Sequence, residues 1–559
     1  MDYSRLAELL YPEINYTPKY WEDKYPVRNL PDGAEVMRFA PSPTGFLHIG
    51  GIMACLIANL MSLRSNGVFY LRIEDTDGKR LVENSIQKII QGFNRFNLTL
   101  DEGRISETED KGNYGPYMQS ERVDIYKTYA KWLVSKGLAY PCFCTQEDLA
   151  KMREYQEKNK LPIGYYGEFA KCRNLSIEQV EKLLQDGRSF VLRFRCPYKQ
   201  GDMMDTVDLI RGERKIPANF NDVIIMKSNG IPPYNFAHAI DDHLMRTTIV
   251  SRGDEWLPSL SEHLQLFEAL NFTPPKYMHI SPVQIIDPNT NERRKLSKRK
   301  DPEADVEYFA KIGFPVQSII EYLMILVNSN FEDWRNENLD KLIREFDFQI
   351  SKMSDSGALF DIVKLSDVSK NVVSRMSAQK VYDMLLIWAN NWDNEFAKVL
   401  VDNKDYYIDI LNIDRDIPKP RKDIAKWSEV KDIYDYMFDY GYLPNRGYNA
   451  NEVDFGEFNK EIVKSVLKEY PNIYDINDDQ TVWFDKIKDL AERLGYAREV
   501  KLYKKNPELY PGHCGDISTI IRIALTNRRM TPNLYHICRL LGVDRMKSRF
   551  NAILENLEK

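Results

Sequence analysis

The sequence predicts an α/β half followed by an all-helical half. In roughly the first 300 residues, short apolar and β-branched segments alternate with segments of helical apolar spacing. This alternation is typical of a parallel sheet with crossover helices. Beyond Lys300 strand-like segments nearly vanish and helical spacing dominates. A chain of 559 residues is too long for one hydrophobic core, so about three to five domains are expected.

The first elements follow one another in strand–helix order. VMRF (36–39) has the composition of a short buried strand, and IGGIMACLIANLMSLRSNG is expected to form a helix closed by Gly67. VFYLRIED (68–75) predicts a second strand because it is β-branched, aromatic and apolar. Helical spacing returns in SIQKIIQGFNRFNL, from Ser85.

The pattern changes between about 115 and 220, where the helical segment ERVDIYKTYAKWLVSKG is followed by Tyr-, Pro- and Cys-containing loops and a strand, SFVLRFRCP. We interpret this region as an insertion that interrupts the sheet. Sheet-like material is expected again in DVIIMKSNGIPPYNFAHAIDDHLM, with a turn at Ser-Asn-Gly. A strand, TTIVSRG, and a helix, LPSLSEHLQLFEALNF, complete this half.

The second half carries helical spacing throughout. The segments that show it are SIIEYLMILVNS, AQKVYDMLLIWANNW, NKEIVKSVLKEY and DKIKDLAERLGY.

Composition restricts the class of protein. No apolar run approaches the roughly 20 residues that span a bilayer, and the acidic N-terminus lacks the features of a secretory signal. Seven cysteines suit a reducing cytoplasm better than a disulfide scaffold. The net charge of −6 argues against indiscriminate nucleic-acid coating. The last 62 residues nevertheless carry twelve Lys or Arg against six Asp or Glu, which fits a solvated face or a phosphate-contacting patch.

Two loops carry the chemistry. In RFAPSPTGFLHIGG (38–51), prolines stiffen a turn and His48 stands before Gly50 and Gly51 at a helix start. A helix N-terminus presents unpaired N–H groups, and glycines allow close approach, so this is a natural phosphate site. His48 alone is equally compatible with a capping or packed residue. In ERRKLSKRKD (292–301), Lys295 and Lys298 flank a small hydroxyl residue and suit a triphosphate.

Together the two loops resemble the HIGH and KMSKS blocks of class I aminoacyl-tRNA synthetases. The wider segments RFAPSPTGFLHIGG, FYLRIEDTD, YNFAHAIDDHLM, SRGDEWLPS, RKLSKRKD and ALTNRRMTPNLYHICRLLG resemble the bacterial type of the glutamyl-tRNA synthetase family. The resemblance covers most of the chain from about Arg38 and is weakest before residue 35 and between about 380 and 500. It implies a Rossmann-type catalytic domain with an α+β insertion, followed by all-α stem-contact and anticodon-binding domains.

The resemblance implies ATP-dependent attachment of L-glutamate to tRNA(Glu) through a glutamyl-adenylate, with Mg²⁺ as the ATP counter-ion and a cytoplasmic monomer. It implies catalytic roles for His48, Lys295 and Lys298. The ATP contacts it implies are His48, Gly50, Gly51, Glu255, Trp256, Lys295, Ser297 and Lys298. The glutamate contacts it implies are Arg38, Ala40, Ser42, Glu74, Tyr234 and Arg252. The two arginines suit a carboxylate because a guanidinium binds it bidentately and stays charged.

The resemblance also implies domain boundaries. They are 1–35 for an N-terminal extension of open role, 36–114 and 221–290 for the catalytic halves, 115–220 for an acceptor-end-binding insertion, 291–375 for a stem-contact domain and 376–559 for an anticodon-binding domain. The implied RNA contacts are Arg528, Arg529, Arg539, Arg545 and Arg549.

A possible Zn²⁺ site lies in the insertion, where Cys142, Cys144 and Cys172 resemble the zinc site of some family members. A histidine often stands two residues after the last cysteine in those members, and Asn174 stands there in this sequence. Tyr166 is the candidate fourth ligand, and packed thiols without metal are the alternative.

Rival functions remain open at this point. A non-discriminating enzyme would also charge tRNA(Gln), and a catalytically inactive paralogue would only bind tRNA. A glutaminyl-tRNA synthetase would be expected to follow its core with β-barrels, and the shortened relative that glutamylates a tRNA base lacks the helical half.

Overall fold

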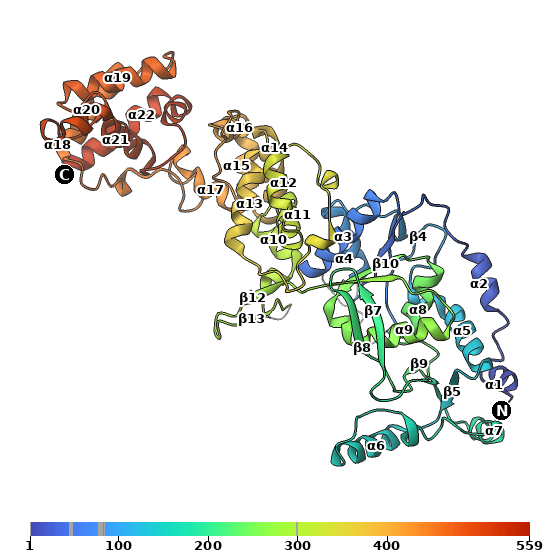
Figure 1. The fold of residues 1–559 in the computed structure, drawn as a ribbon. Helices are drawn as coiled ribbons and strands as arrows, with labels where there is room; N and C mark the ends of the chain where they lie inside the picture. Colours follow the sequence, from blue (N-terminus) through green and yellow to red (C-terminus); the bar gives the residue numbers. More distant parts are fainter. Residues whose placement is uncertain (1, 44–47, 77–81, 83, 298–299, 559) are drawn as a thin grey trace. The chain divides into compact units, whose positions relative to one another are not determined.

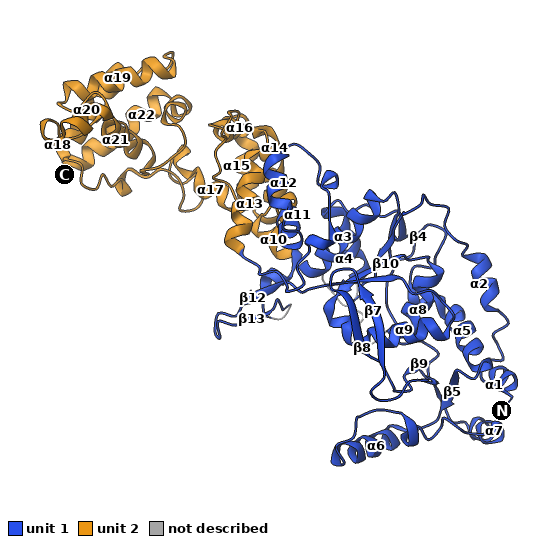
Figure 2. Ribbon diagram, viewed as in Figure 1, with its two compact units in different colours: residues 1–306, 320–361 blue, residues 307–319, 362–559 orange. Residues whose placement is uncertain are grey.

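The computed structural model describes residues 2–43, 48–76, 82, 84–297 and 300–558. They divide into two compact units, which are described separately (Figure 2). Unit 1 comprises residues 1–306 and 320–361, and unit 2 comprises residues 307–319 and 362–559.

Unit 1 is built on a mixed sheet that is parallel through its middle (Figure 1). Its strands are β1 (Val36–Phe39), β2 (Val68–Leu71), β3 (Glu102–Arg104), β4 (Asp110–Lys111), β7 (Met203–Asp208), β8 (Gly212–Pro217), β10 (Ile249–Gly253) and β11 (Lys276–Ile280). They lie in the order β4-β3-β2-β1-β10-β11-β7-β8, and only β4 and β8 pair antiparallel with their neighbours. The predicted parallel sheet is confirmed.

The helices of unit 1 connect and cover these strands. They are α1 (Tyr3–Leu10), α2 (Pro18–Lys24), α3 (Ile49–Arg64), α4 (Ser85–Arg95), α5 (Val123–Ser135), α6 (Gln146–Lys158), α7 (Ile177–Gln185), α8 (Tyr234–Leu244), α9 (Leu260–Ala269) and α12 (Phe331–Glu337). The helix α3 packs against β1, β2 and β10, which explains why it is apolar around most of its circumference.

The strand order reverses at β1. The chain runs from β1 through α3 to β2 on one side, whereas β10 lies on the other side of β1 and leads through α9 to β11. Loops leaving the carboxyl ends of β1 and β10 therefore diverge and leave a crevice between them. Open α/β sheets bind their ligands at such a switch point.

Two details differ from the sequence prediction. Residues 234–244 form the helix α8 rather than sheet, because Phe236, Ala237, Ile240 and Leu244 are buried at helical spacing. The predicted boundary at residue 220 also does not separate the sheets. The strands β7 and β8 join the main sheet, while β9 (Ile224–Met226) pairs with β6 (Val191–Phe194) and β6 with β5 (Ala139–Cys142).

The N-terminal extension packs into unit 1. The helices α1 and α2 lie against α5 and bury Leu6, Leu10 and Trp21 in the same core as α5 and α8. Its far end is tied to the main sheet, because Arg28 makes two hydrogen bonds to the Glu102 carboxylate at 2.8 and 2.9 Å. The described residues of the extension, 2–35, thus contribute to the core of unit 1.

A small hairpin leaves the main sheet after β11. It consists of β12 (Gln284–Ile286) and β13 (Arg293–Lys295), which pair antiparallel with Gln284 opposite Lys295. The hairpin returns the second basic loop to the carboxyl edge of the sheet.

The regular elements in the described residues of unit 2 are helices, as predicted. Its helices are α13 (Ile362–Ser374), α14 (Ala378–Trp392), α15 (Asn394–Asp402), α16 (Lys404–Asn412), α17 (Val430–Ile433), α18 (Lys460–Ile473), α19 (Gln480–Arg493), α20 (Val500–Lys505), α21 (Cys514–Thr526) and α22 (Leu534–Glu558). The helices α10 (Val306–Ile312) and α11 (Val316–Val327) carry the chain across the unit boundaries. In the part of the chain that the structure describes, no helix is long and apolar enough to cross a membrane.

Candidate active site

A cavity of about 640 Å³ opens at the switch point of the main sheet. Arg38 and Phe39 reach it from the end of β1, Ser251 and Arg252 from the end of β10, and Ile280 from the end of β11. The backbone topology alone therefore places this cavity where an α/β sheet holds its ligand.

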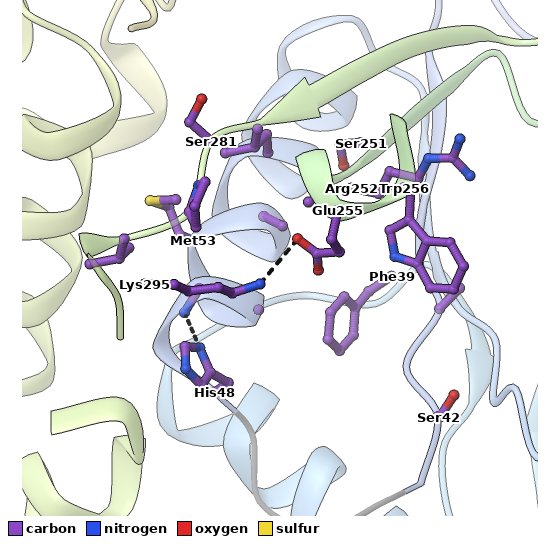
Figure 3. Close-up of a pocket in the computed structure, with 18 of the residues that line it drawn as sticks. Phe39, Ser42, His48, Met53, Ser251, Arg252, Glu255, Trp256, Ser281 and Lys295 are labelled. Atoms are coloured by element: carbon purple, nitrogen blue, oxygen red, sulfur yellow. Dashed lines mark hydrogen bonds and ion pairs between the residues drawn. The ribbon is translucent and has the colours of Figure 1, made fainter. Parts of the chain in front are cut away.

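The cavity collects the residues predicted from separate segments of the sequence. Those that line it are Arg38, Ala40, Ser42, His48, Gly50, Gly51, Glu74, Tyr234, Arg252, Glu255, Trp256, Lys295 and Ser297. The remaining predicted residue, Lys298, lies outside the described residues, as do Thr44 and Gly45 of the first loop. Figure 3 shows that Lys295 and His48 lie at one side of the cavity and that Arg252 and Trp256 lie at the other.

His48 both caps the helix α3 and lines the cavity. Its Nδ1 accepts a hydrogen bond from the backbone N–H of Gly50 at 2.9 Å, so one unpaired donor of the first turn is satisfied. In the neutral ring this bond places the proton on Nε2. His48 can therefore cap the helix and face the cavity at the same time.

The second basic loop is closed at its base by an ion pair. Arg294 donates from Nη1 and Nη2 to the two carboxylate oxygens of Asp301 at 2.6 and 2.8 Å. The same carboxylate accepts from the backbone N–H of Ser297 at 2.7 Å. Lys295 extends across the cavity to Glu255, with 3.2 Å between its Nζ and the carboxylate (Figure 3). A polyanion placed here would meet a cation held by a weak, half-exposed ion pair.

A buried charge network lies under the floor of the cavity. Asp242 accepts from Arg72 Nη1 at 2.7 Å and from Arg38 Nε at 3.2 Å. Arg72 also donates from Nη2 to Glu74 Oε1 at 2.9 Å. This network fixes Arg38 and Glu74 where they face the cavity, and it neutralises Arg38 with a carboxylate.

Burial sets the protonation of this network. It raises the pKa of Glu74, against the opposing effect of the Arg72 and Arg38 guanidiniums. For Asp242 the two guanidiniums outweigh burial and hold its pKa well below the usual range. Burial also lowers the pKa of His238 to about 4, although Asp242 lies 2.7 Å from its Nδ1.

Arg252 is held differently from Arg38. Its Nε donates to His279 Nε2 at 3.0 Å, its Nη2 to His263 Nδ1 at 3.1 Å and its Nη1 to Tyr234 Oη at 3.3 Å. The sequence prediction included Arg252 and Tyr234 but missed both histidines. A histidine that alternates with apolar residues in YMHIS (277–281) was the available signal for His279.

Comparisons with known proteins show which family the chain resembles. The family model described as tRNA synthetases class I (E and Q), catalytic domain, matches residues 35–367. The chain belongs to this synthetase family. It is 46% identical over 555 residues to a glutamate–tRNA ligase of Clostridium perfringens, which covers 99% of this chain and all of that protein. It is 45% identical, over 99% of its length, to a glutamate–tRNA ligase of Acetivibrio thermocellus that it covers completely.

Solved structures include a similar fold. The crystal structure of a glutamate tRNA ligase from Elizabethkingia meningosepticum in complex with its amino acid superposes with a TM-score of 0.74 at 25% sequence identity. The match covers 94% of the present synthetase and 100% of that chain.

The inserted segment of the synthetase gathers three thiols. The Sγ atoms of Cys142, Cys144 and Cys172 lie within 4.8 Å of one another, and Cys144 and Cys172 are 3.7 Å apart. The predicted fourth member, Tyr166, is wrong, because its hydroxyl donates to the Pro162 carbonyl at 2.8 Å. Tyr165 takes that place, with its hydroxyl 3.4 Å from Cys142 Sγ and 3.3 Å from Cys144 Sγ. Successive residues of an extended segment point to opposite sides, so the neighbour reaches the thiols.

The C-terminal arginines of the synthetase do not form one uniform surface. Arg529 and Arg539 are exposed, while Arg528 and Arg545 are half-buried. Arg549 does not fit the predicted RNA contact: it is buried, and its Nη1 donates to the carbonyls of Tyr436 and Leu525 at 2.7 and 2.5 Å. Charge alone could not distinguish this buried arginine, which binds backbone carbonyls, from the more exposed arginines near it in the sequence.

Proposed function

We propose that this synthetase attaches L-glutamate to tRNA(Glu) by way of a glutamyl-adenylate. One observation carries the proposal. Described residues of the two loops, 38–51 and 292–301, line the same cavity at the sheet's switch point as Glu74 and Arg252. The full-length similarity to glutamate–tRNA ligases supports the choice of amino acid.

The first step needs positioning and charge stabilisation rather than a protein nucleophile. The α-carboxylate of glutamate attacks the α-phosphorus of ATP, the bond to the bridging oxygen breaks, and pyrophosphate leaves with its charge. A ribose hydroxyl at the tRNA end then attacks the acyl carbon and releases AMP. Orientation of the reactants and stabilisation of charge on the phosphates supply the catalysis.

The amino acid is proposed to occupy the side of the cavity that Arg252 lines. Arg252 and Arg38 offer guanidiniums for carboxylates, and Glu74 offers a carboxylate for the α-ammonium group. Ala40, Ser42 and Tyr234 complete the proposed pocket.

ATP is proposed to lie between the two basic-block loops. The start of α3, with His48, Gly50 and Gly51, faces it from one side, and Lys295 and Ser297 face it from the other (Figure 3). The sequence assigns Lys298 to the same phosphates. Glu255 and Trp256 are the proposed contacts from the segment after β10, and Mg²⁺ accompanies the nucleotide without a dedicated protein cage.

The tRNA is proposed to contact both units. The inserted region would hold the acceptor end, the residues around 291–375 the stem, and residues 376–559 the anticodon. Of the basic C-terminal side chains, Arg528, Arg529, Arg539 and Arg545 retain enough exposure to contact RNA. We further infer a monomer in the reducing cytoplasm, in line with thiols that are all free.

The thiol cluster is proposed to bind Zn²⁺ through Cys142, Cys144, Cys172 and the Tyr165 phenol. A tetrahedral zinc with Zn–S bonds of about 2.3 Å separates its sulfurs by about 3.8 Å, close to the 3.7 Å between Cys144 and Cys172. The ion would fix the insertion's loops and takes no part in the chemistry. We expect about one zinc ion per chain in the purified wild type and its loss in Cys144→Ser. An equal zinc content in the wild type and the variant would contradict the site.

Aminoacylation of purified tRNA tests the function. We expect glutamate to be attached to tRNA(Glu) in an ATP-dependent reaction. Charging of tRNA(Gln) as well would make the enzyme non-discriminating, and binding of tRNA without any charging would make it an inactive paralogue and overturn the proposal.

A further inference from the structure

The two arginines that face the amino-acid end of the cavity are neutralised differently. Arg38 is paired with the Asp242 carboxylate, whereas all three hydrogen bonds of Arg252 go to uncharged acceptors. Within the described part of the chain, no carboxylate forms an ion pair with Arg252. Arg252 is only 6% exposed, so solvent contributes little to screening its charge.

Other residues fix the tautomers of the two histidines so that each presents an unprotonated ring nitrogen to Arg252. His279 lies opposite Arg252 on the neighbouring strand, and its Nδ1 lies 2.7 Å from Asp208 Oδ2. Arg252 can only donate, so His279 Nε2 must accept and Nδ1 must carry the proton toward Asp208. Asp208 is itself held by the backbone N–H groups of Ile210, Arg211 and His279, each at 3.0 Å.

His263 is oriented in the same way from the helix α9. Its Nδ1 accepts from Arg252, so Nε2 carries the proton and donates to Asn235 Oδ1 at 2.9 Å. Both histidines are completely buried, and burial lowers the pKa of each, which keeps the rings uncharged. The strands β7 and β11 and the helix α9 thus converge on one guanidinium.

This arrangement leaves binding capacity as well as charge. An arginine has five N–H donors, and the three bonds of Arg252 use three of them. The remaining two belong to Nη1 and Nη2, one on each nitrogen, and are left for a carboxylate of the substrate. A carboxylate placed here could accept both remaining hydrogen bonds and would neutralise the charge of Arg252. An amide has no charge, and its NH2 group is a donor that cannot accept from Arg252.

We propose that His263 and His279 are specificity-determining positioning residues, which hold Arg252 with uncharged acceptors so that its positive charge is kept for a carboxylate of the substrate. The proposal rests on the proposed function, since it requires glutamate in this cavity. Had the same bonds been made by aspartate or glutamate, Arg252 would be oriented equally well but already neutralised.

A matched pair of variants isolates charge from orientation. An asparagine or aspartate side chain places an oxygen near the position of the histidine Nδ1, so His263→Asn supplies a neutral acceptor and His263→Asp a charged one of the same shape. We expect His263→Asn to keep the KM for glutamate close to that of the wild type. His263→Asp should raise it about tenfold or more, because an ion pair of Arg252 must first be broken.

A second pair tests orientation at the other ring. Glutamine places its oxygen near the position of Nε2, so His279→Gln should preserve glutamate recognition, whereas His279→Leu should raise the KM for glutamate about tenfold or more. In each damaged variant kcat and the KM for ATP should change much less than the KM for glutamate. Inhibition by glutamine should strengthen relative to glutamate binding in His263→Asp only.

The measurements distinguish a failure of the proposed function from a failure of the inference about His263 and His279. Glutamate-dependent pyrophosphate exchange by the wild type in the presence of tRNA is measured first, and its absence would refute the proposed function itself. If the wild type is active, equal glutamate KM values in His263→Asn and His263→Asp refute the role of charge, and equal values in His279→Gln and His279→Leu refute the role of the acceptor. Variants that do not fold by thermal melting are replaced by the other pair.

Discussion

At the scale of single residues, the two glycines that line the cavity differ in how much room the protein leaves for a side chain. A Cβ on Gly51 would lie 3.6 Å from the Phe39 ring, an ordinary contact. A Cβ on Gly50 would approach the capping His48 ring to 3.2 Å, which requires a small shift. The protein itself therefore leaves room for alanine at position 51, although that position faces the cavity.

Replacing Gly51 separates stability from nucleotide binding. Gly51→Ala should leave the free energy of unfolding unchanged or raise it by up to about 1 kcal/mol, since alanine is the better helix former. The new methyl group would occupy space proposed for ATP, so the KM for ATP should rise about tenfold while the KM for glutamate changes little. An unchanged KM for ATP in exchange kinetics would show that the nucleotide does not approach this turn.

Glu74 makes the recognition of glutamate depend on pH. Burial raises its pKa, so in acid the free enzyme loses this carboxylate earlier than an exposed glutamate would. If the carboxylate binds the α-ammonium group, kcat/KM for glutamate should fall as the pH decreases through the raised pKa.

Glu74→Gln supplies the control for that profile. The variant should lower kcat/KM for glutamate about tenfold at neutral pH and lose the acid limb assigned to Glu74. A variant that retains the same acid limb as the wild type would exclude Glu74 as its source.

At the scale of elements, the sequence predicted β1, β2 and β10 and the helices α3, α4, α5 and α9, because their signals are local, but it did not predict β3, β4, β7, β8 or β11. VMRF is a short and mostly apolar segment, TTIVSRG is short and begins with four β-branched residues, and IGGIMACLIANLMSLR is too long for a strand. The prediction was wrong for YNFAHAIDDHL, where buried polar residues hide the helical period. Asp241 and Asp242 are buried there because Arg122, Arg72 and Arg38 neutralise them, and such distant partners cannot be read from one segment.

The N-terminal helices are an element whose role the sequence left open. They pack against α5, and Glu22 in α2 accepts hydrogen bonds from His243 and Arg246 at the end of α8, at 2.7 and 2.8 Å. The opposite end of α8 carries Tyr234, which contacts Arg252. The extension thus supports the helix that reaches the amino-acid end of the cavity.

Truncating a side chain in this extension should destabilise unit 1. Leu6 is 1% exposed, so Leu6→Ala should cost about 2–5 kcal/mol of stability. Val27 in the same segment is 82% exposed, and Val27→Ala should stay within about 0.5 kcal/mol. Thermal unfolding of the full chain measures both, and equal midpoints for the two variants would show that the extension does not belong to the cooperative core.

At the scale of the whole molecule, the sequence predicted which residues line the cavity, but it did not predict which residues hold Arg252 in place. Thirteen predicted residues from the two basic blocks and the intervening segments line one cavity. Asp208, His263 and His279 were missed, because a residue that acts on Arg252 through space has no fixed spacing from it in sequence. Tyr166 was chosen over Tyr165 for a similar reason, since side-chain direction depends on the local backbone.

The cavity of unit 1 is proposed to activate glutamate. Glutamate-dependent exchange of pyrophosphate into ATP, with tRNA(Glu) present, tests it most directly. The wild type should catalyse exchange with glutamate in clear preference to glutamine, and Arg252→Ala should raise the KM for glutamate at least about tenfold with little change in the KM for ATP. Absence of exchange by the wild type, or an unaltered glutamate KM in Arg252→Ala, would contradict the account.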